Sequence, residues 1–371
     1  MNPIIERMKE NEKFKRFLVA VDEKEDFRDA TYFLRDDGSF IFSEGYCHGI
    51  EKPRGERKIV SHIVFAPWNA ARPAPEYAQK MLFGQKYENV TKEIMTTQPL
   101  DRFYPMQLKR YIDVDPAQAE HPRPIYARYK AMIPLASIVG CFPHRHSLQA
   151  IIAKADEDPS ARSVKIVTEH TAELLRIGAE QIGISGSLSL GTYKNPHDLD
   201  YVIYGTASQV KRMVNFMYSL TDTDEKRRVH EFGKYWPIRF WDWAGKEKFM
   251  VCPFFSYIDP EEAPLRNFDC ENLGEATVEG RIADHTHNAF NPSVLILEEA
   301  KLNGKEHPPI TRFILYHGGE RGDWREGYRV SVKGYHVRIV SYRVRNGQRQ
   351  KKEEFEAVLV NNLDQAKRIN K

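Results

Sequence analysis

The chain has 371 residues, a length that favours two or three domains over one small module. Hydrophobic residues make up 41% and charged residues 29%, which excludes disordered, collagen-like and low-complexity proteins. The 55 Lys and Arg residues against 52 Asp and Glu residues give a net charge of +3, too small an excess to indicate nucleic-acid binding by itself.

The cysteines and the apolar segments bear on location. Four cysteines lie far apart, at Cys47, Cys141, Cys252 and Cys270. Without a Cys-x-x-Cys pair they indicate neither a disulfide framework nor a zinc ribbon, so a reducing compartment is expected. Residues 1–17 lack an apolar stretch of signal-peptide length, and the most apolar segment, 131–142, is too short to cross a membrane. We therefore expect a cytoplasmic protein without a membrane partner.

Residues 1–149 are predicted to form an N-terminal β-rich domain with a few helices. Strand-like runs cover 31–34, 40–43 and 58–65. The sequence Asp36-Asp37-Gly38-Ser39 between the first two runs is typical of a hairpin turn.

Residues 150–260 are predicted to form an α+β domain. A plausible N-cap at Ser160 or Ser163 precedes apolar residues at helical spacing, and Thr206 to Gln209 form a capping box that begins a second helix. The predicted elements are, in order, a helix ending near Gly178, strands at 181–184 and 198–205, a helix to Leu220, and a hairpin of strands 238–243 and 249–257 around the turn Ala244-Gly245-Lys246.

Residues 261–371 are predicted to form a C-terminal β-rich, barrel-like domain. The expected strands are 293–297, 310–316, 328–332, 337–342 and 355–360. Two basic stretches, 226–228 and 343–352, fit solvated faces; the alternative is an electrostatic footprint for a phosphate-bearing partner, because barrels of this size can bind RNA or DNA strands.

The segment with the most chemical information runs from Gly183 to Gly205, where a strand leads into Gly186-Ser187 and a second strand begins at Asp198-Leu199-Asp200. Glycine lets the backbone approach phosphate oxygens, and amides at the start of a helix favour an anion. We therefore expect Gly186 and Ser187 to hold a triphosphate.

Asp198 and Asp200 lie two residues apart in a predicted strand, so both carboxylates point to one face while Leu199 and Tyr201 point to the other. Paired carboxylates suit Mg²⁺, which takes oxygen ligands and bridges them to substrate phosphates, and two such ions can stabilise an in-line displacement. The alternative is a solvated strand edge or a capping pair.

This order of strand, Gly-Ser, a spacer from Leu188 to His197 and then Asp-x-Asp resembles the nucleotidyltransferases of the DNA polymerase beta superfamily. Gly-Ser-Leu-x-x-Gly at 186–191 and Asp-Leu-Asp-x-x-x-Tyr-Gly at 198–205 are also similar to a group of uncharacterised multi-domain predicted nucleotidyltransferases. Outside this core, residues 44–48 and 318–327 look similar to the flanking domains of that group.

The resemblance implies a polymerase-beta-type domain with a mixed sheet, and a third carboxylate on a later strand. Asp242, between two tryptophans on the predicted hairpin, is our candidate for that metal ligand and catalytic residue, with Glu231 and Asp259 as rivals. It also implies Mg²⁺, a nucleoside triphosphate, attack on the α-phosphate and release of pyrophosphate.

The acceptor and the oligomeric state are not implied. An RNA or DNA end, a protein, or a small hydroxyl compound of aminoglycoside type are all compatible with the resemblance. The main alternative function is a catalytically inactive protein of this fold that binds nucleotide or nucleic acid. Two histidine groups, His144 with His146 near Cys141 and His285 with His287, lack the spacing of a zinc module and are interpreted as core or surface residues.

Overall fold

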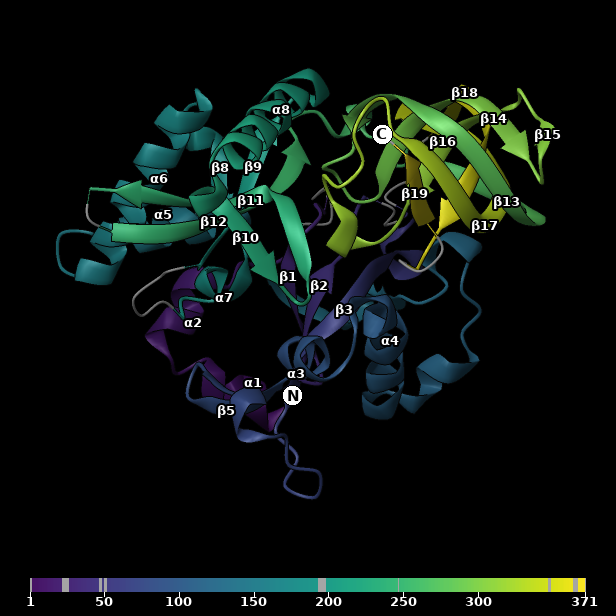
Figure 1. Ribbon diagram of the computed structural model, residues 1–371. Coiled ribbons are helices and arrows are strands. Elements are labelled where there is room, and N and C mark those ends of the chain that lie inside the picture. The colour runs from purple at the N-terminus through teal and green to yellow at the C-terminus, as the bar shows by residue number, and fades with distance from the viewer. Residues whose placement is uncertain are drawn as a thin grey trace.

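The computed structural model describes residues 2–21, 27–46, 49, 52–192, 198–245, 247–345, 348–362 and 366–370. Within this part the protein has eight α-helices and three β-sheets, one antiparallel and two mixed, so the expected mixed α+β class is confirmed. Figure 1 shows the first sheet below the other two, which lie side by side above it. None of the described helices is long and apolar enough to span a membrane.

The first sheet is antiparallel and follows the order β4-β5-β3-β2-β1-β7, with β6 paired to β3. Its strands are β1 (Tyr32–Arg35), β2 (Phe40–Ser43), β3 (Lys58–Pro67), β4 (Gln79–Leu82), β5 (Gln85–Asn89), β6 (Ala131–Pro134) and β7 (Ile138–Phe142). The turn from β1 to β2 contains Gly38 at φ +86°, a conformation that favours glycine, and the hairpin expected there is confirmed.

Four helices belong to this first unit. They are α1 (Pro3–Met8), α2 (Glu12–Phe17), α3 (Val90–Thr97) and α4 (Phe103–Val114). Helices α3 and α4 contact each other and strand β3, and they bring Phe103 and Tyr104 into the core of this unit.

The second sheet is mixed and has the order β10-β11-β12-β9-β8, in which only β12 and β9 run parallel. Its strands are β8 (Ile182–Ile184), β9 (Asp198–Gly205), β10 (Arg228–Glu231), β11 (Lys234–Ala244) and β12 (Glu247–Tyr257). The helices around it are α5 (His144–Ile152), α6 (Pro159–Leu175), α7 (Gly186–Ser189) and α8 (Ala207–Thr223).

Local capping sets where the two long helices begin. The capping box of Thr206 and Gln209 begins α8, as predicted. Helix α6 begins earlier than expected, because its N-cap is Asp158 and not Ser160 or Ser163. The side chain of Asp158 accepts hydrogen bonds from the backbone N–H groups of Ser160 and Ala161.

The third sheet contains β13 (Phe268–His287), β14 (Ser293–Leu302), β15 (Lys305–Glu306), β16 (Ile310–Leu315), β17 (Arg329–Arg345), β18 (Gln348–Val360) and β19 (Ala366–Asn370). The path β13-β14-β16-β18-β17 closes on itself because β17 also pairs with β13. The interior of this closed sheet is filled by one apolar cluster that includes Val278, Leu295 and Val358.

Two expectations for the third sheet differ from the structure. Strand β13 was not predicted, because charged residues interrupt its apolar pattern. The two strands expected at 328–332 and 337–342 are one strand, β17, with Gly334 in its middle. A Cβ atom at Gly334 would collide with the carbonyl oxygen of Leu359 on β18, so this glycine permits a close approach of two strands and does not mark a turn.

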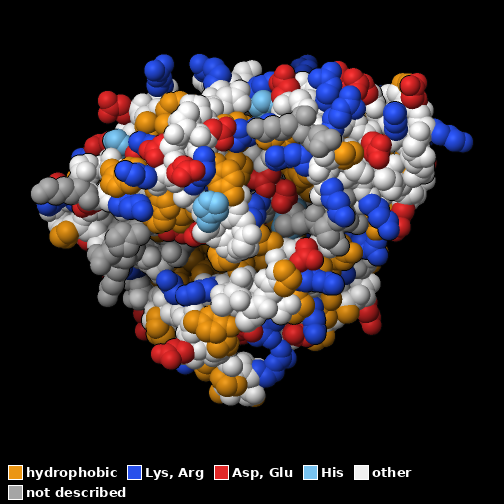
Figure 2. Space-filling view, viewed as in Figure 1, with side chains coloured by type: hydrophobic (Ala, Val, Ile, Leu, Met, Phe, Trp, Pro, Cys, Tyr) orange, Lys and Arg blue, Asp and Glu red, His pale blue; other side chains and the backbone are white. Residues whose placement is uncertain are grey.

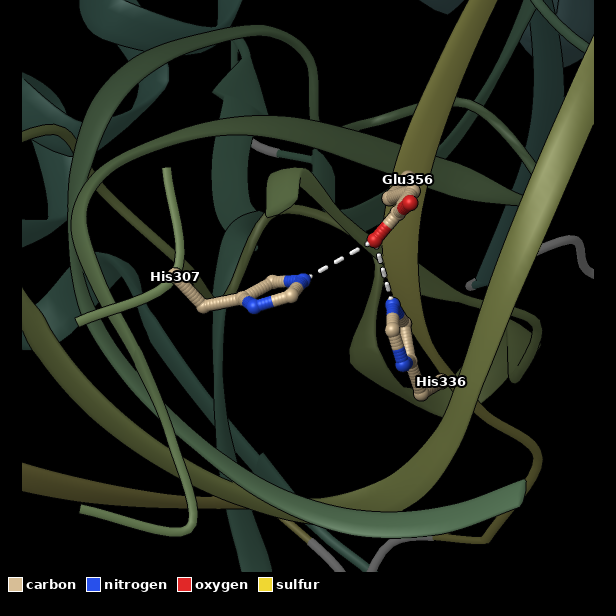
Figure 3. A group of neighbouring side chains, drawn as sticks. All are labelled: His307, His336 and Glu356. Carbon is tan, nitrogen blue, oxygen red and sulfur yellow. Dashed lines mark hydrogen bonds and ion pairs between the residues drawn. The ribbon is translucent and has the colours of Figure 1, made fainter. Parts of the chain in front are cut away.

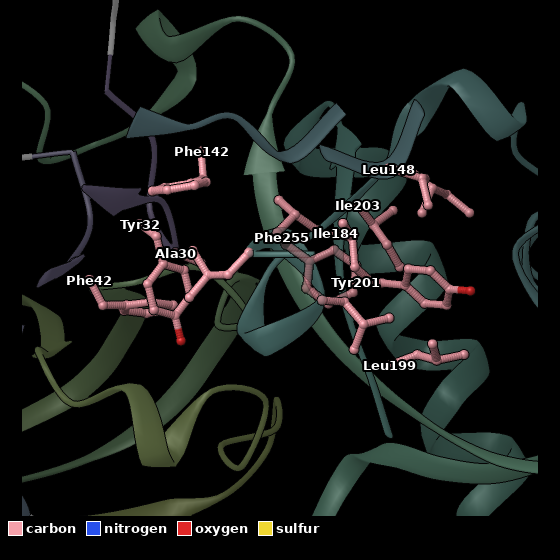
Figure 4. Close-up of a cluster of buried hydrophobic side chains, with 14 of the residues drawn as sticks. Ala30, Tyr32, Phe42, Phe142, Leu148, Ile184, Leu199, Tyr201, Ile203 and Phe255 are labelled. Carbon is pink, nitrogen blue, oxygen red and sulfur yellow. The ribbon is translucent and has the colours of Figure 1, made fainter. Parts of the chain in front are cut away.

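The largest core connects the first and second units. Figure 4 shows Ala30, Tyr32 and Phe42 from the first unit on one side and Leu199, Tyr201 and Ile203 of β9 on the other. Because one buried cluster spans both units, the first unit holds a fixed position against the second sheet.

Candidate active site

The backbone around Gly186 is fitted tightly to strand β9. The N–H group of Ser185 donates to the carbonyl oxygen of Asp200 at 2.7 Å, and Gly186 follows with φ +59°. A Cβ atom on Gly186 would overlap the Asp200 carboxylate. Only glycine lets the first turn of α7 approach the carboxylate this closely.

The two carboxylates of β9 share one face, as the strand period predicts. Asp198 and Asp200 line the same cavity, whereas Leu199 and Tyr201 are fully buried on the opposite face. On that face the hydroxyl groups of Tyr201 and Thr168 of α6 are 2.9 Å apart. Helix α6 therefore covers one side of the sheet, and the carboxylates occupy the other.

The neighbouring strands supply two more polar groups on the carboxylate face. Cys252 of β12 lies beside Asp200 in the parallel register, and its thiol donates to Asp198 Oδ1 at 3.1 Å. Ligand atoms of Asp198, Asp200 and Cys252 lie within 4.8 Å of one another. Arg239 of β11 lies in the same cavity and donates to Glu231 Oε2 at 2.8 Å.

Burial and like charge set the electrostatics of this group. Burial first, and then the Asp198 carboxylate, raise the pKa of Asp200 to about 8, although Arg239 lowers it. Burial also raises the pKa of the Cys252 thiol, which keeps the thiol protonated as a donor to Asp198. A cation between the two carboxylates would therefore relieve their repulsion.

Asp242, the residue expected to be the third carboxylate, is not brought together with the other two. It lies on β11 opposite Phe249. Asp242 and Arg239 are an odd number of residues apart on this strand, so their side chains point to opposite faces and that of Asp242 is on the face covered by α6. Its carboxylate is 2.7 Å from Arg227 Nη1 and 3.2 Å from Nε2 of His170, and only 3% of the residue is exposed. These contacts give Asp242 a structural ion pair.

The two rivals of Asp242 have different positions. Glu231 lines the same cavity as Asp198 and Asp200, and its carboxylate pairs with Arg239, whose charge also acts on Asp200. Asp259 is exposed and caps a short 3₁₀ helix by accepting from the N–H of Glu261. Of the three candidates, only Glu231 shares the cavity with the Asp-x-Asp pair.

The cavity has a volume of about 270 Å³ and lies where the three units meet. The first unit contributes Phe42, Glu44 and Tyr104, and the third unit contributes His317, Gly318, Gly319 and Arg321. Phe254 of β12 lies between these walls. Figure 2 shows hydrophobic side chains along the hollow that crosses the middle of the molecular face in view.

A buried ion-pair network holds the far wall. Arg321 Nη2 lies 2.9 Å from Asp29 Oδ2, and its guanidinium lies over the ring of Phe254. The Nε and Nη1 atoms of Arg321 have no hydrogen-bond partner among the described residues, although 95% of the residue is buried. Buried donors without partners are costly, so these nitrogens are suited to oxygen atoms of a bound molecule.

Glu44 is the centre of the same network. Nδ1 of His62 is 2.6 Å from Glu44 Oε1, the Tyr104 hydroxyl donates to the same oxygen at 2.9 Å, and Lys130 Nζ is 3.4 Å from Oε2. Although burial alone raises it, the positive charge of Lys130 and the His62 hydrogen bond hold the pKa of Glu44 below its usual range. Glu44 is therefore an anion at the cavity wall.

The sequence contained a signal for these wall residues. The two flanking stretches, 44–48 and 318–327, both reach the cavity, through Glu44 and through Gly318, Gly319 and Arg321. Cys47 and His48 lie outside the described residues, as do 193–197 of the spacer. Arg239 and Cys252 were missed, because nothing in the sequence states which strand lies beside β9.

Ser187 and the C-terminal basic stretch make local hydrogen bonds and ion pairs among the described residues. Ser187 lies in the first turn of α7, beyond Gly186, and its carbonyl oxygen accepts from the N–H and the hydroxyl of Thr192.

In the C-terminal basic stretch, Arg349 pairs with Asp269 and Lys351 with Glu354. Those two cations are neutralised locally, which fits the interpretation of a solvated face.

Comparisons of the chain with protein-family models, with curated proteins and with solved structures find no match in any of the three.

Asp200→Asn is expected to stabilise the protein in a pH-dependent way. Because the folded-state pKa of Asp200 is raised, the wild type loses stability between about pH 4, where the unfolded carboxyl ionises, and about pH 8. We expect no gain for the variant below pH 4 and a gain on the order of 2 kcal/mol at pH 8, with partial solvent screening taken into account. Urea unfolding of both proteins from pH 4 to 9 measures this difference. A gain that is the same at every pH would contradict the charge repulsion.

Proposed function

We propose that the protein is a Mg²⁺-dependent nucleotidyltransferase that moves a nucleoside monophosphate from a triphosphate to a hydroxyl acceptor. The observation that carries the proposal is the pair of carboxylates on Asp198 and Asp200, which face one cavity with the Gly186 backbone packed against them. The strand, glycine turn and Asp-x-Asp strand of a mixed sheet, covered by helices on its other face, support a polymerase-beta-type domain for this region.

The chemistry follows from the residues in the cavity. The acceptor oxygen forms a bond to the α-phosphorus and loses its proton to solvent, while the bond from that phosphorus to the bridging oxygen breaks and pyrophosphate leaves. Asp198 and Asp200 would hold Mg²⁺, which would offset the negative charge of the phosphates and lower the pKa of the attacking hydroxyl. Glu231 is our candidate for the third carboxylate, and Arg239 holds it near the pair.

The charge of the cavity favours a compact acceptor over a nucleic-acid end. Four carboxylates line it, those of Glu44, Asp198, Asp200 and Glu231, against the two guanidinium groups of Arg239 and Arg321. Both guanidinium groups already pair with a carboxylate. A triphosphate would enter this lining together with Mg²⁺, whereas the phosphates of a nucleic-acid strand would be repelled. A neutral or cationic hydroxyl compound fits the lining, and its oxygens would accept hydrogen bonds from Arg321.

Nucleotide binding is expected to require the carboxylate pair. A nucleoside triphosphate with Mg²⁺ should raise the melting temperature of the wild type. At a ligand concentration a hundred times the Kd, the free energy of unfolding should increase by about 2.7 kcal/mol. The double variant Asp198→Asn, Asp200→Asn should show no such shift, whereas Asp259→Asn, outside the cavity, should keep it. Thermal unfolding with each of the four triphosphates measures this. If no triphosphate shifts the wild type, the nucleotidyltransferase proposal is contradicted and the non-catalytic alternative is favoured.

Glu231 and Asp242 are expected to respond differently to neutralisation. Glu231→Gln should weaken the apparent affinity for Mg²⁺ with triphosphate by about tenfold, or 1.4 kcal/mol, because a carboxylate of the cavity is lost. Asp242→Asn should leave that affinity unchanged but lower the melting temperature of the free protein, because Arg227 loses its buried partner. Titration of the thermal shift separates the two. Weaker nucleotide binding in Asp242→Asn alone would restore Asp242 as the third carboxylate.

Nucleic acid is expected not to enter the cavity. A fluorescent single-stranded RNA or DNA should reach no saturation below about 10⁻⁴ M protein at moderate salt. Fluorescence anisotropy with the wild type and Arg321→Gln measures this. Tighter, salt-dependent binding that is lost in Arg321→Gln would place a nucleic acid in the cavity and contradict the compact acceptor. Binding lost only in Arg343→Gln with Arg345→Gln would place a nucleic acid on the C-terminal basic stretch instead.

A further inference from the structure

A second group of chemically capable side chains lies in the third unit, away from the cavity. His307 follows the short strand β15, His336 lies on β17 and Glu356 lies on β18. Glu356 is on the same face of β18 as Val358, which is buried in the interior cluster of the closed sheet. The three side chains therefore lie at one end of that interior, on segments that are far apart in the sequence.

The three side chains converge on one point. Nε2 of His307 is 3.0 Å and Nε2 of His336 is 2.7 Å from the same oxygen, Oε2 of Glu356. Figure 3 shows the two imidazole rings pointing at this carboxylate from different directions. The ligand atoms of all three lie within 4.8 Å of one another, close enough to surround a single ion at normal bond lengths.

The surroundings leave this point available to an ion. Arg338 Nη2 lies 3.9 Å from Oε1 of Glu356, on the other carboxylate oxygen, so Oε2 is directed to the imidazoles. The side chains of His307, His336 and Glu356 are 29%, 12% and 20% exposed, which gives solvent ions access. The acidic and histidine group at Asp284, His285 and Glu326 differs, because the ammonium group of Lys211 already contacts both of its carboxylates.

We propose that His307, His336 and Glu356 bind one divalent transition-metal ion of the zinc class. Two neutral imidazole nitrogens and one carboxylate oxygen form a ligand set that zinc uses, and the fourth position would be taken by water. Each neutral imidazole would turn an Nε2 lone pair toward the metal and carry its proton on Nδ1, so the two Nε2 hydrogen bonds to Glu356 would be exchanged for metal–ligand bonds. The bound ion joins the β15–β16 connection to β17 and β18, which stabilises the closed sheet independently of the nucleotide site.

The test uses full-length protein prepared without metal-affinity chromatography, stripped with EDTA and dialysed against Zn²⁺ at pH 7.5. Elemental analysis should find one more zinc per chain in the wild type than in His307→Gln or His336→Gln, whose zinc affinity should fall by at least about tenfold. His121→Gln, which changes an exposed histidine outside the group, is the matched control and should bind as the wild type does. Zinc should raise the melting temperature of the wild type and the control only.

A second measurement needs no variant. Co²⁺ added to the stripped wild type should give the visible absorption bands of a four-coordinate site, and one equivalent of Zn²⁺ should remove them. The absence of such bands, or equal zinc content in all four proteins, would overturn the proposal and leave His307 and His336 as hydrogen-bond donors to Glu356.

Discussion

The repulsion between two carboxylates that share one face of strand β9 is the constraint around which the candidate site is built. The alternation of the strand forces Asp198 and Asp200 together, and the packed Gly186 backbone leaves Asp200 little solvent. The positive charge of Arg239, on β11, offsets part of this repulsion. The protonated thiol of Cys252, on the neighbouring strand β12, donates a hydrogen bond to Asp198. A site in this condition favours a cation, and that preference is the physical basis of the magnesium proposal.

The cavity beside this pair exists only because three units meet. The core that joins the first and second sheets fixes one wall, and the pair of Arg321 with Asp29 fixes the wall from the third unit to the first. The pair of Arg321 with Asp29 is buried, so the removal of one partner would leave an uncompensated charge. The outer units therefore shape the place where an acceptor would lie, and the excess of carboxylates there argues for a compact acceptor.

The third unit has its own polar centre, separate from the cavity. Its closed sheet is filled by an apolar cluster, and the converging group of His307, His336 and Glu356 lies at one end of that cluster. Nothing in the spacing of these residues suggests a metal module, since their sequence separation is unlike that of a zinc finger. Only the pairing of β17 with β18 and the path of the chain after β15 bring them together.

The sequence by itself determined what depends on neighbours along the chain. Helix α8 and its capping box, strand β9, the hairpin of β11 and β12, and the shared face of Asp198 with Asp200 all follow from local hydrogen bonding and side-chain periodicity. The cap of α6 at Asp158 was the local detail that differed, because several residues in that stretch can cap a helix.

Tertiary structure decided what depends on which strands become neighbours. The hairpin that carries Asp242 was predicted, but the alternation of side chains along β11 turns the Asp242 side chain toward His170. The pairing of β12 with β9, and of β11 with β12, brings Cys252 and Arg239 to the carboxylate face instead. The segment around Gly334 was predicted to be a turn between two strands. A glycine that allows close strand packing cannot be distinguished in the sequence from a glycine that allows a bend. Register and strand order arise from contacts between distant segments, and no local pattern encodes them.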